Sequence, residues 1–166
     1  MDPSFIKPFI ASIKNVFSTM LQLPVTIGDP RIKADSSNSF DVSGIIGMSG
    51  DVMGTVVLSF PSDAAERIVT LFCGQKLDAN TPDFADAVGE LVNMVSGGAK
   101  AMFAGKKVSI SCPSVVVGKH HHIARQSDIP TICVPCNTDC GEVVIELSIR
   151  DNTAANAAPK AAAAQA

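Results

Sequence analysis

The sequence contains no Trp and no Tyr, and aromatic residues make up only 5% of its 166 residues. It also has no basic run, since 13 Lys and Arg residues stand against 16 Asp and Glu residues, for a formal net charge of −3. Surfaces that bind nucleic acid need cations for the phosphate backbone and aromatic rings for base stacking. The composition therefore argues against a nucleic-acid partner.

Long apolar runs are also missing. Gly, Pro, Ser or a charged residue interrupts each hydrophobic stretch well before the roughly 20 residues that a membrane span needs. Lys7 and Lys14 break up the apolar N-terminal segment, which therefore does not resemble a signal peptide. The five cysteines are an odd number in a chain large enough to fold without disulfides, so reduced thiols are expected. We expect a cytoplasmic protein with no membrane partner.

Hydrophobic residues make up 46% of the chain, which is enough for one compact domain with a substantial core. We expect this domain to span residues 1–150. The Ala-rich remainder, residues 151–166, offers no apolar face that could dock on the domain. That tail is expected to be frayed or disordered.

Apolar spacing predicts three helices, at residues 3–21, 63–73 and 82–105. Asp2 and Thr81 precede prolines at the starts of the two long helices, where an N-cap followed by proline is favoured. Asp63 and Glu66 have the spacing of a capping box at the start of the short helix.

Apolar segments between turn residues predict seven strands, at residues 25–28, 40–48, 52–60, 108–111, 114–117, 129–135 and 142–149. A long helix followed by about three strands thus occurs twice, with the short helix between the two halves. This order predicts an α+β fold with a pseudo-twofold repeat, in which one sheet packs against the long helices. Alignment of the two long helices supports the duplication, because Asn15 falls opposite Asn93 and Ser12 falls opposite Glu90.

Glu90 and Asn93 lie three positions apart on the longest predicted helix, opposite its apolar stripe of Phe84, Leu91, Val95 and Met102. Their face also holds Asp86, Lys100 and three small residues, Gly97, Ala101 and Ala104. A solvated face usually carries long polar side chains instead, and each mid-helix Gly costs about 1 kcal/mol relative to Ala. The pattern favours a face on which another surface packs closely. Plain solvated residues are the alternative, since Glu and Asn are common on exposed helices.

Residues 86–100, DAVGELVNMVSGGAK, resemble the motif helix of the CheC/CheX/FliY family of bacterial chemotaxis phosphatases, in which Glu-x-x-Asn is followed by small residues. The resemblance continues in three further segments, GTVVLSF at 54–60, SISCPSVVVG at 109–118 and GEVVIEL at 141–147. They follow one another in the order and spacing of the family. The resemblance covers residues 1–150.

The resemblance implies a phosphatase that hydrolyses the aspartyl phosphate of CheY, the response regulator that controls the flagellar motor. Asn93 would position the attacking water in the partner's active site, and Glu90 would pair with the active-site Lys of the regulator. An amide suits this role because it donates and accepts hydrogen bonds without ionising. The chain is expected to carry no cofactor of its own, with Mg²⁺ in the site of the response regulator. The resemblance also implies a homodimer, for which edge-strand pairing is one arrangement.

The first repeat departs from the two-site members of the family. Asn15 keeps the amide, but Ser12 cannot supply a carboxylate and Lys14 adds a positive charge. We therefore predict one functional site per chain, with a mainly structural first helix. The alternative function is a non-catalytic module that binds a response regulator or a flagellar switch component.

Cys133, Cys136 and Cys140, with His120–His122 upstream, contain the donor atoms of a zinc site. Their spacing lacks a second Cys-x-x-Cys pair, and Pro135 lies within the predicted strand. We interpret them as core or turn thiols and a solvated His loop, with a metal sensor as the alternative. Five methionines fit core filling: Met20, Met48, Met53, Met94 and Met102.

Overall fold

The computed structural model describes residues 3–34, 39–124 and 128–157 of the chain. Its strands are β1 (Thr26–Ile27), β2 (Arg31–Ile32), β3 (Val42–Gly50), β4 (Val52–Phe60), β5 (Val108–Ile110), β6 (Ser114–Val117), β7 (Ile132–Thr138) and β8 (Gly141–Asp151). They form one antiparallel sheet of order β1-β7-β8-β4-β3-β5. Within this sheet β2 also pairs with β7, and β6 also pairs with β3.

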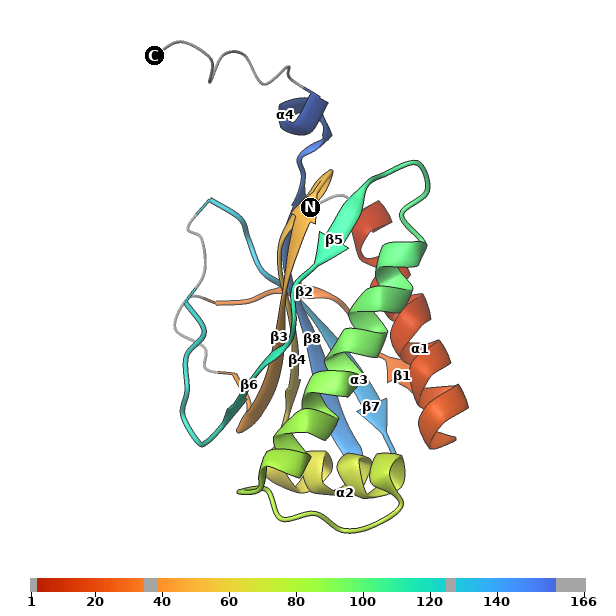
Figure 1. The fold of residues 1–166 in the computed structure, drawn as a ribbon, viewed down its shortest axis with the longest axis vertical. Helices are drawn as coiled ribbons and strands as arrows, with labels where there is room; N and C mark the ends of the chain where they lie inside the picture. Colours follow the sequence, from red (N-terminus) through yellow and green to blue (C-terminus); the bar gives the residue numbers. More distant parts are fainter. Residues whose placement is uncertain (1–2, 35–38, 125–127, 158–166) are drawn as a thin grey trace.

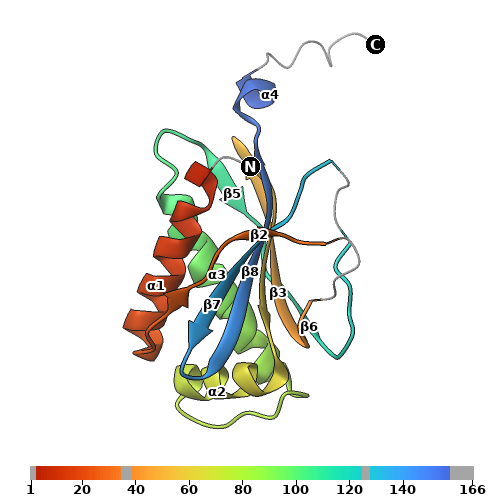
Figure 2. The ribbon, with the colours of Figure 1, turned by 180° about the vertical axis from the view of Figure 1, so that it is seen from behind.

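The helices are η1 (Pro3–Phe5, 3-10), α1 (Lys7–Leu21), α2 (Ser62–Cys73), α3 (Pro82–Ala101) and α4 (Thr153–Ala157). Figure 1 shows α1 and α3 on one side of the sheet, α2 across its lower end, and the connections around β2 and after β6 on the other side. Figure 2 shows the same two layers from behind. Within the described ranges, no helix is long and apolar enough to cross a membrane.

The sheet has a pseudo-twofold arrangement. Strands β4 and β8 pair at its centre, β3 and β7 flank them, and two short strands extend each side. The short strands β1 and β2, which follow α1, pair with β7 of the second half, whereas β5 and β6, which follow α3, pair with β3 of the first half. The predicted α+β fold with a repeated helix-and-strands unit is confirmed.

The core lies between the sheet and the two long helices. Its largest fully buried side chains include Phe9, Phe17, Phe60, Phe84, Ile46 and Leu147. The rings of Phe5 and Phe9 lie 5.9 and 6.1 Å from the ring of Phe103, which joins the start of α1 to the segment just after α3. The two helices therefore run antiparallel, as Figure 1 shows.

Close backbone approach fixes α3 on both sides. A Cβ on Gly98 would overlap the hydroxyl oxygen of Ser12 in α1, and a Cβ on Gly44 in β3 would lie 2.9 Å from Cγ1 of Val92. The Ser12 hydroxyl also donates a 2.7 Å hydrogen bond to the carbonyl oxygen of Val95. The helix that carries Glu90 is thus held by α1 and by the sheet.

The predicted start of α3 is confirmed, because the Thr81 side chain accepts a hydrogen bond from the Phe84 N–H. Its predicted end at residue 105 is wrong. The helix ends at Ala101, and Gly105 has a φ of 72° in the left-handed region. The start of α1 also differs, since this helix begins at Lys7 after a 3-10 turn, and the predicted N-cap Asp2 lies outside the described residues.

The predicted capping box of α2 is wrong. Asp63 and Glu66 lie in the first turns of the helix, but no side-chain cap forms at its N-cap residue, Pro61. Instead, Oδ2 of Asp41 accepts hydrogen bonds from the backbone N–H of Ser62 at 3.3 Å and from its hydroxyl at 2.9 Å. A residue 21 positions earlier supplies the acceptor, which no local sequence pattern could indicate.

Two further differences concern short elements and methionines. Strand β2 was not predicted, because one of its two residues is the charged Arg31 and the segment has no apolar run. The tail predicted to be disordered begins with the last residue of β8 and the short helix α4, where Oδ1 of Asp151 accepts a hydrogen bond from Thr153 N–H. Residues 158–166 lie outside the described residues.

Met48 is buried as predicted, but Met20 and Met102 are 47% and 46% exposed and do not fill the core.

Candidate functional site

The outward face of α3 carries the residues that the sequence singled out. Asp86, Glu90 and Lys100 are exposed, whereas Asn93 and Gly97 are half-buried. An α-helix advances 100° and about 1.5 Å per residue, so residues seven apart lie almost in line and about 10 Å apart. Asp86, Asn93 and Lys100 therefore form one line along the helix, and Glu90 and Gly97 lie on a neighbouring line. Glu90 and Asn93 both lie in α3, about one helical turn apart, with Glu90 exposed and Asn93 half-buried.

The polar side chains of this face are free to meet a partner. Within the described part of the chain, neither Glu90 nor Asn93 forms a side-chain hydrogen bond or an ion pair. The same holds for Asp86 and Lys100, within the same ranges. An exposed carboxylate without an internal ion-pair partner retains its full capacity to pair with a cation on another protein.

The two adjacent glycines of α3 serve different purposes. Gly98 faces α1, where the side chain of Ser12 fills the space beside it. Gly97 faces outward, and a Cβ placed on it would meet none of the described atoms within 4 Å, its chain neighbours and the helix's own backbone aside. The contact with α1 therefore requires a Gly at position 98. No contact with the other described elements requires a Gly at position 97.

The connection into β6 borders the candidate face. A Cβ on Gly89 would lie 3.3 Å from Cγ of Pro113 and 3.5 Å from Cγ2 of Val115. Figure 1 shows β6 beside the first half of α3. The helix thus has a packed flank against β6 and an open face that carries Glu90.

The first helix does not present a second copy of this face. Ser12, which the sequence alignment matched with Glu90, is 1% exposed and lies in the contact between α1 and α3. Asn15 and Lys14 are exposed on α1. The alignment of Ser12 with Glu90 therefore matches a buried position with an exposed one, and position 12 has a packing role.

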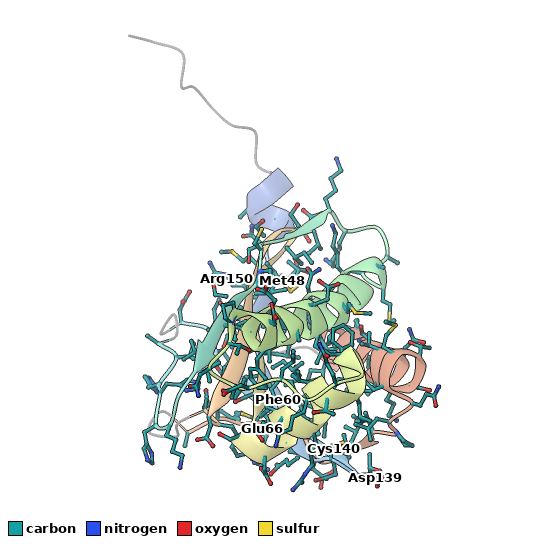
Figure 3. All side chains as sticks on the ribbon, turned by 60° about the horizontal axis from the view of Figure 1, so that its bottom comes forward. Met48, Phe60, Glu66, Asp139, Cys140 and Arg150 are labelled. Carbon is teal, nitrogen blue, oxygen red and sulfur yellow. The ribbon has the colours of Figure 1, made fainter. Side chains whose placement is uncertain are left out.

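The cysteines of the second half are buried, as the interpretation of core or turn thiols required. Cys133, Cys136 and Cys140 are 7%, 0% and 9% exposed. Burial raises the pKa of Cys136 to about 12, with a further rise from the nearby charge of Glu142. Figure 3 shows Cys140 beside α2, where its carbonyl oxygen accepts a 3.3 Å hydrogen bond from Arg67.

The His loop is only partly solvated. His120 and His122 are exposed, but His121 is half-buried, and its Nε2 lies 2.8 Å from Oγ of Ser43. Its Nδ1 lies 2.8 Å from the carbonyl oxygen of Gly118. Among the residues that the structure describes, no three His, Cys, Asp or Glu side chains are grouped so that they could hold a metal ion.

Sequence reasoning missed a buried ion pair on the sheet face opposite the helices. Nζ of Lys33 lies 2.7 and 2.8 Å from the two carboxylate oxygens of Glu146, and it donates a 3.1 Å hydrogen bond to Ser39. The two charged side chains are 6% and 8% exposed and line a cavity of about 380 Å³ with Arg31. Glu146 lies between the buried apolar residues Ile145 and Leu147 in β8. Because side chains alternate between the two faces of a strand, this local pattern indicated that Glu146 faces away from those two residues.

Comparisons with known proteins agree with this architecture. A family model described as "Chemotaxis phosphatase CheX" matches residues 42–137. A curated relative, "CheY-P phosphatase CheX" of Thermotoga maritima, is 28% identical over 122 residues, which are 72% of this chain and 79% of that protein. A crystal structure of a CheC-like superfamily protein from Shewanella sp. PV-4 is 36% identical, with a TM-score of 0.82, and the match covers 90% of this chain and 99% of that chain.

A more distant structure is a complex of CheX, CheY, BeF3 and Mg²⁺ from Borrelia burgdorferi. It is 20% identical with a TM-score of 0.73, and the match covers 89% of this chain and 98% of that chain. The fold of the present chain is therefore CheC-like. Within that superfamily, the chain belongs to the CheX family of chemotaxis phosphatases.

Proposed function

We propose that this chain hydrolyses the aspartyl phosphate of a CheY-type response regulator that docks on the outward face of α3. The observation that carries the proposal is the free pair of Glu90 and Asn93 on a helix that packs closely against α1 and β3. The membership in the CheX family and the name of the Thermotoga maritima relative support the same activity.

Asn93 positions the water that attacks the phosphorus atom. The water oxygen forms a bond to phosphorus while the bond from phosphorus to the aspartyl oxygen breaks, which releases an aspartate carboxylate and inorganic phosphate. The carboxamide oxygen of Asn93 accepts a hydrogen bond from the water, and its NH₂ group can donate to a phosphoryl oxygen. Such a reaction mainly requires placement of the water and stabilisation of charge, so a neutral amide suffices.

Glu90 binds rather than reacts. Its exposed carboxylate lies one helical turn before Asn93, within reach of a Lys beside the phosphoaspartate of the regulator. An ion pair at that point brings the amide of Asn93 to the phosphoryl group and accelerates encounter.

Mg²⁺ belongs to the response regulator in this proposal. When bound there, the ion stabilises negative charge on the phosphoryl oxygens. This chain contributes the amide of Asn93 and the carboxylate of Glu90, and it has one such pair. The first repeat supplies no second pair in this proposal, because the hydroxyl of Ser12 donates its hydrogen bond to the carbonyl oxygen of Val95.

The test is the decay of the phosphorylated CheY of the same cell in Mg²⁺, with the wild-type protein and two matched variants. Asn93→Ala should lower kcat about 100-fold, as removal of one positioned catalytic hydrogen-bonding group does. Asn15→Ala removes the same amide from the other exposed helix and should leave activity within about twofold.

Two outcomes would change the proposal. If the wild-type protein binds phosphorylated CheY but does not accelerate its decay, the chain is the non-catalytic docking module. If Asn15→Ala is as damaging as Asn93→Ala, the assignment of one site per chain is wrong.

We also propose that the chain forms a homodimer through an edge strand of its sheet. Support comes from β6, where Val117 is 41% exposed on a strand that pairs with β3. Light scattering after size-exclusion chromatography should give twice the mass of 17.2 kDa. A monomer mass at all concentrations would exclude the dimer.

A further inference from the structure

We infer that Lys100 sets the rotational orientation of the docked response regulator, through an ion pair with a carboxylate on the regulator about 10 Å along the helix from its phosphoaspartate. The inference rests on the proposed function and concerns the same face of α3. It assigns a specificity-determining role to a residue outside the Glu90 and Asn93 pair.

Two contacts cannot orient a protein by themselves when they lie close together. Glu90 and Asn93 are three residues apart, so they fix the partner within about 5 Å along the helix axis. A docked protein held only there could still rotate about that point. A third contact at a larger distance removes this rotation, and Lys100 lies one full seven-residue step beyond Asn93 on the same line.

The charge of Lys100 is available for such a contact. Its side chain is exposed and forms no hydrogen bond or ion pair with the described residues. Lys100 lies in the last turn of α3, where a cation interacts favourably with the helix dipole. A Lys at any position in that turn would have the same effect, so the dipole does not explain this particular position. The position in line with Asn93 is what a partner bound to this face would meet.

The line also has a direction. Asp86 lies one seven-residue step before Asn93 and Lys100 one step after it, so the face is negative at one end and positive at the other. A partner turned by 180° would bring its carboxylate against Asp86 and its cation toward Lys100. Repulsion between like charges disfavours that arrangement. The charges on this face therefore destabilise the reversed orientation and also stabilise the correct one.

The surface of α3 at Gly97, between Asn93 and Lys100, is not covered by another described element. A Cβ on Gly97 would lie more than 4 Å from every described atom, apart from its two chain neighbours and the helix's own backbone. The backbone of α3 is therefore open to the partner over the interval that the third contact must span.

Lys100→Glu and Lys14→Glu test the inference as a matched pair. Both change the net charge by the same amount, and Lys14 is an exposed residue on α1. Binding is measured with CheY activated by beryllofluoride, and hydrolysis with phosphorylated CheY, each at low and high salt. Lys100→Glu should weaken binding and raise KM about tenfold at low salt, with kcat nearly unchanged, and the effect should shrink at high salt. Lys14→Glu should change neither constant by more than about twofold.

The outcomes separate this inference from the proposed function. If Lys100→Glu and Lys14→Glu have equal effects, the role of Lys100 is overturned. The proposed function still stands in that case if the wild-type protein hydrolyses phosphorylated CheY. Binding that depends on Lys100 without any hydrolysis would overturn the phosphatase and support the orienting contact. A charge reversal on the regulator should restore the binding of Lys100→Glu at one position, when single Asp or Glu residues about 10 Å from its phosphoaspartate are changed to Lys. If no position does so, the ion pair is excluded.

Discussion

Ser12 lies directly against Gly98 where α1 crosses α3, and its hydroxyl donates a 2.7 Å hydrogen bond to the carbonyl oxygen of Val95. This contact joins the two halves of the repeat. It holds the helix that carries Glu90 and Asn93, and it removes position 12 from the surface. The same side chain therefore packs the helix that carries the candidate site against α1 and is itself unavailable to a partner protein.

Substitution of the two adjacent glycines of α3 should have opposite effects on stability. Gly98→Ala should lower the free energy of unfolding by about 1–3 kcal/mol, because the new Cβ overlaps the Ser12 hydroxyl. Gly97→Ala should raise it by up to about 1 kcal/mol, because the added Cβ meets no neighbour and Ala favours the helix. Urea denaturation measures both. A loss of stability for Gly97→Ala would contradict the open outward face.

Glu90→Gln should raise KM for phosphorylated CheY about tenfold and change kcat little, because it removes the charge and keeps the shape of the side chain. The salt dependence of kcat/KM should become weaker than that of the wild-type protein. Steady-state kinetics at two salt concentrations measures both effects. A fall in kcat with unchanged KM would instead give Glu90 a role in the chemical step.

Lys33→Met should destabilise the fold by about 3–5 kcal/mol, because it leaves the buried carboxylate of Glu146 without a counter-charge. The double variant Lys33→Met with Glu146→Leu should recover most of this loss. Lys106→Met is the control, since it breaks the more exposed pair with Asp151 and should cost little. Chemical denaturation measures all three, and equal losses for the two Lys→Met variants would contradict the importance of burial.

Asp41→Ala should destabilise the protein by about 1 kcal/mol at pH 7, because α2 loses its acceptor at Ser62. The hydrogen bond from the Ser62 hydroxyl lowers the pKa of Asp41, so its contribution is complete above the ordinary carboxyl pKa of about 4. That contribution is lost as the pH falls through the lower pKa of the folded state. Urea denaturation at pH 7 and near pH 2.5 should show the difference from wild type shrinking. A difference independent of pH would contradict the cap.

Two of the five thiols should react with iodoacetamide in the native protein at pH 8. Cys73 and Cys112 are exposed, whereas Cys133, Cys136 and Cys140 are buried. A pKa of about 12 leaves Cys136 with almost no thiolate at that pH. Peptide mass spectrometry measures the labelling of each residue. Fast labelling of Cys136 would contradict its burial, and stoichiometric zinc in the purified protein would favour the metal sensor.

The sequence alone determined the elements whose patterns repeat over many residues. The apolar spacing of α1 and α3 and the apolar segments of β3, β4 and β8 extend over several turns or strand positions, so they outweigh local exceptions. The helical period also placed Glu90 and Asn93 together on the outward face of α3. The two residues are three positions apart in the sequence. An α-helix places residues at this spacing on the same face, whatever surrounds the helix.

Only the tertiary structure decided which residues meet across the chain. It paired Lys33 with Glu146 over a separation of 113 residues, and it gave α2 an acceptor from Asp41 in place of the local capping box. It also buried Ser12 against Gly98 and left Gly97 open, although the two glycines are adjacent. These contacts depend on the order of strands in the sheet and on the crossing of α1 and α3. A local pattern carries no information about either, because both are set by burial of the whole core.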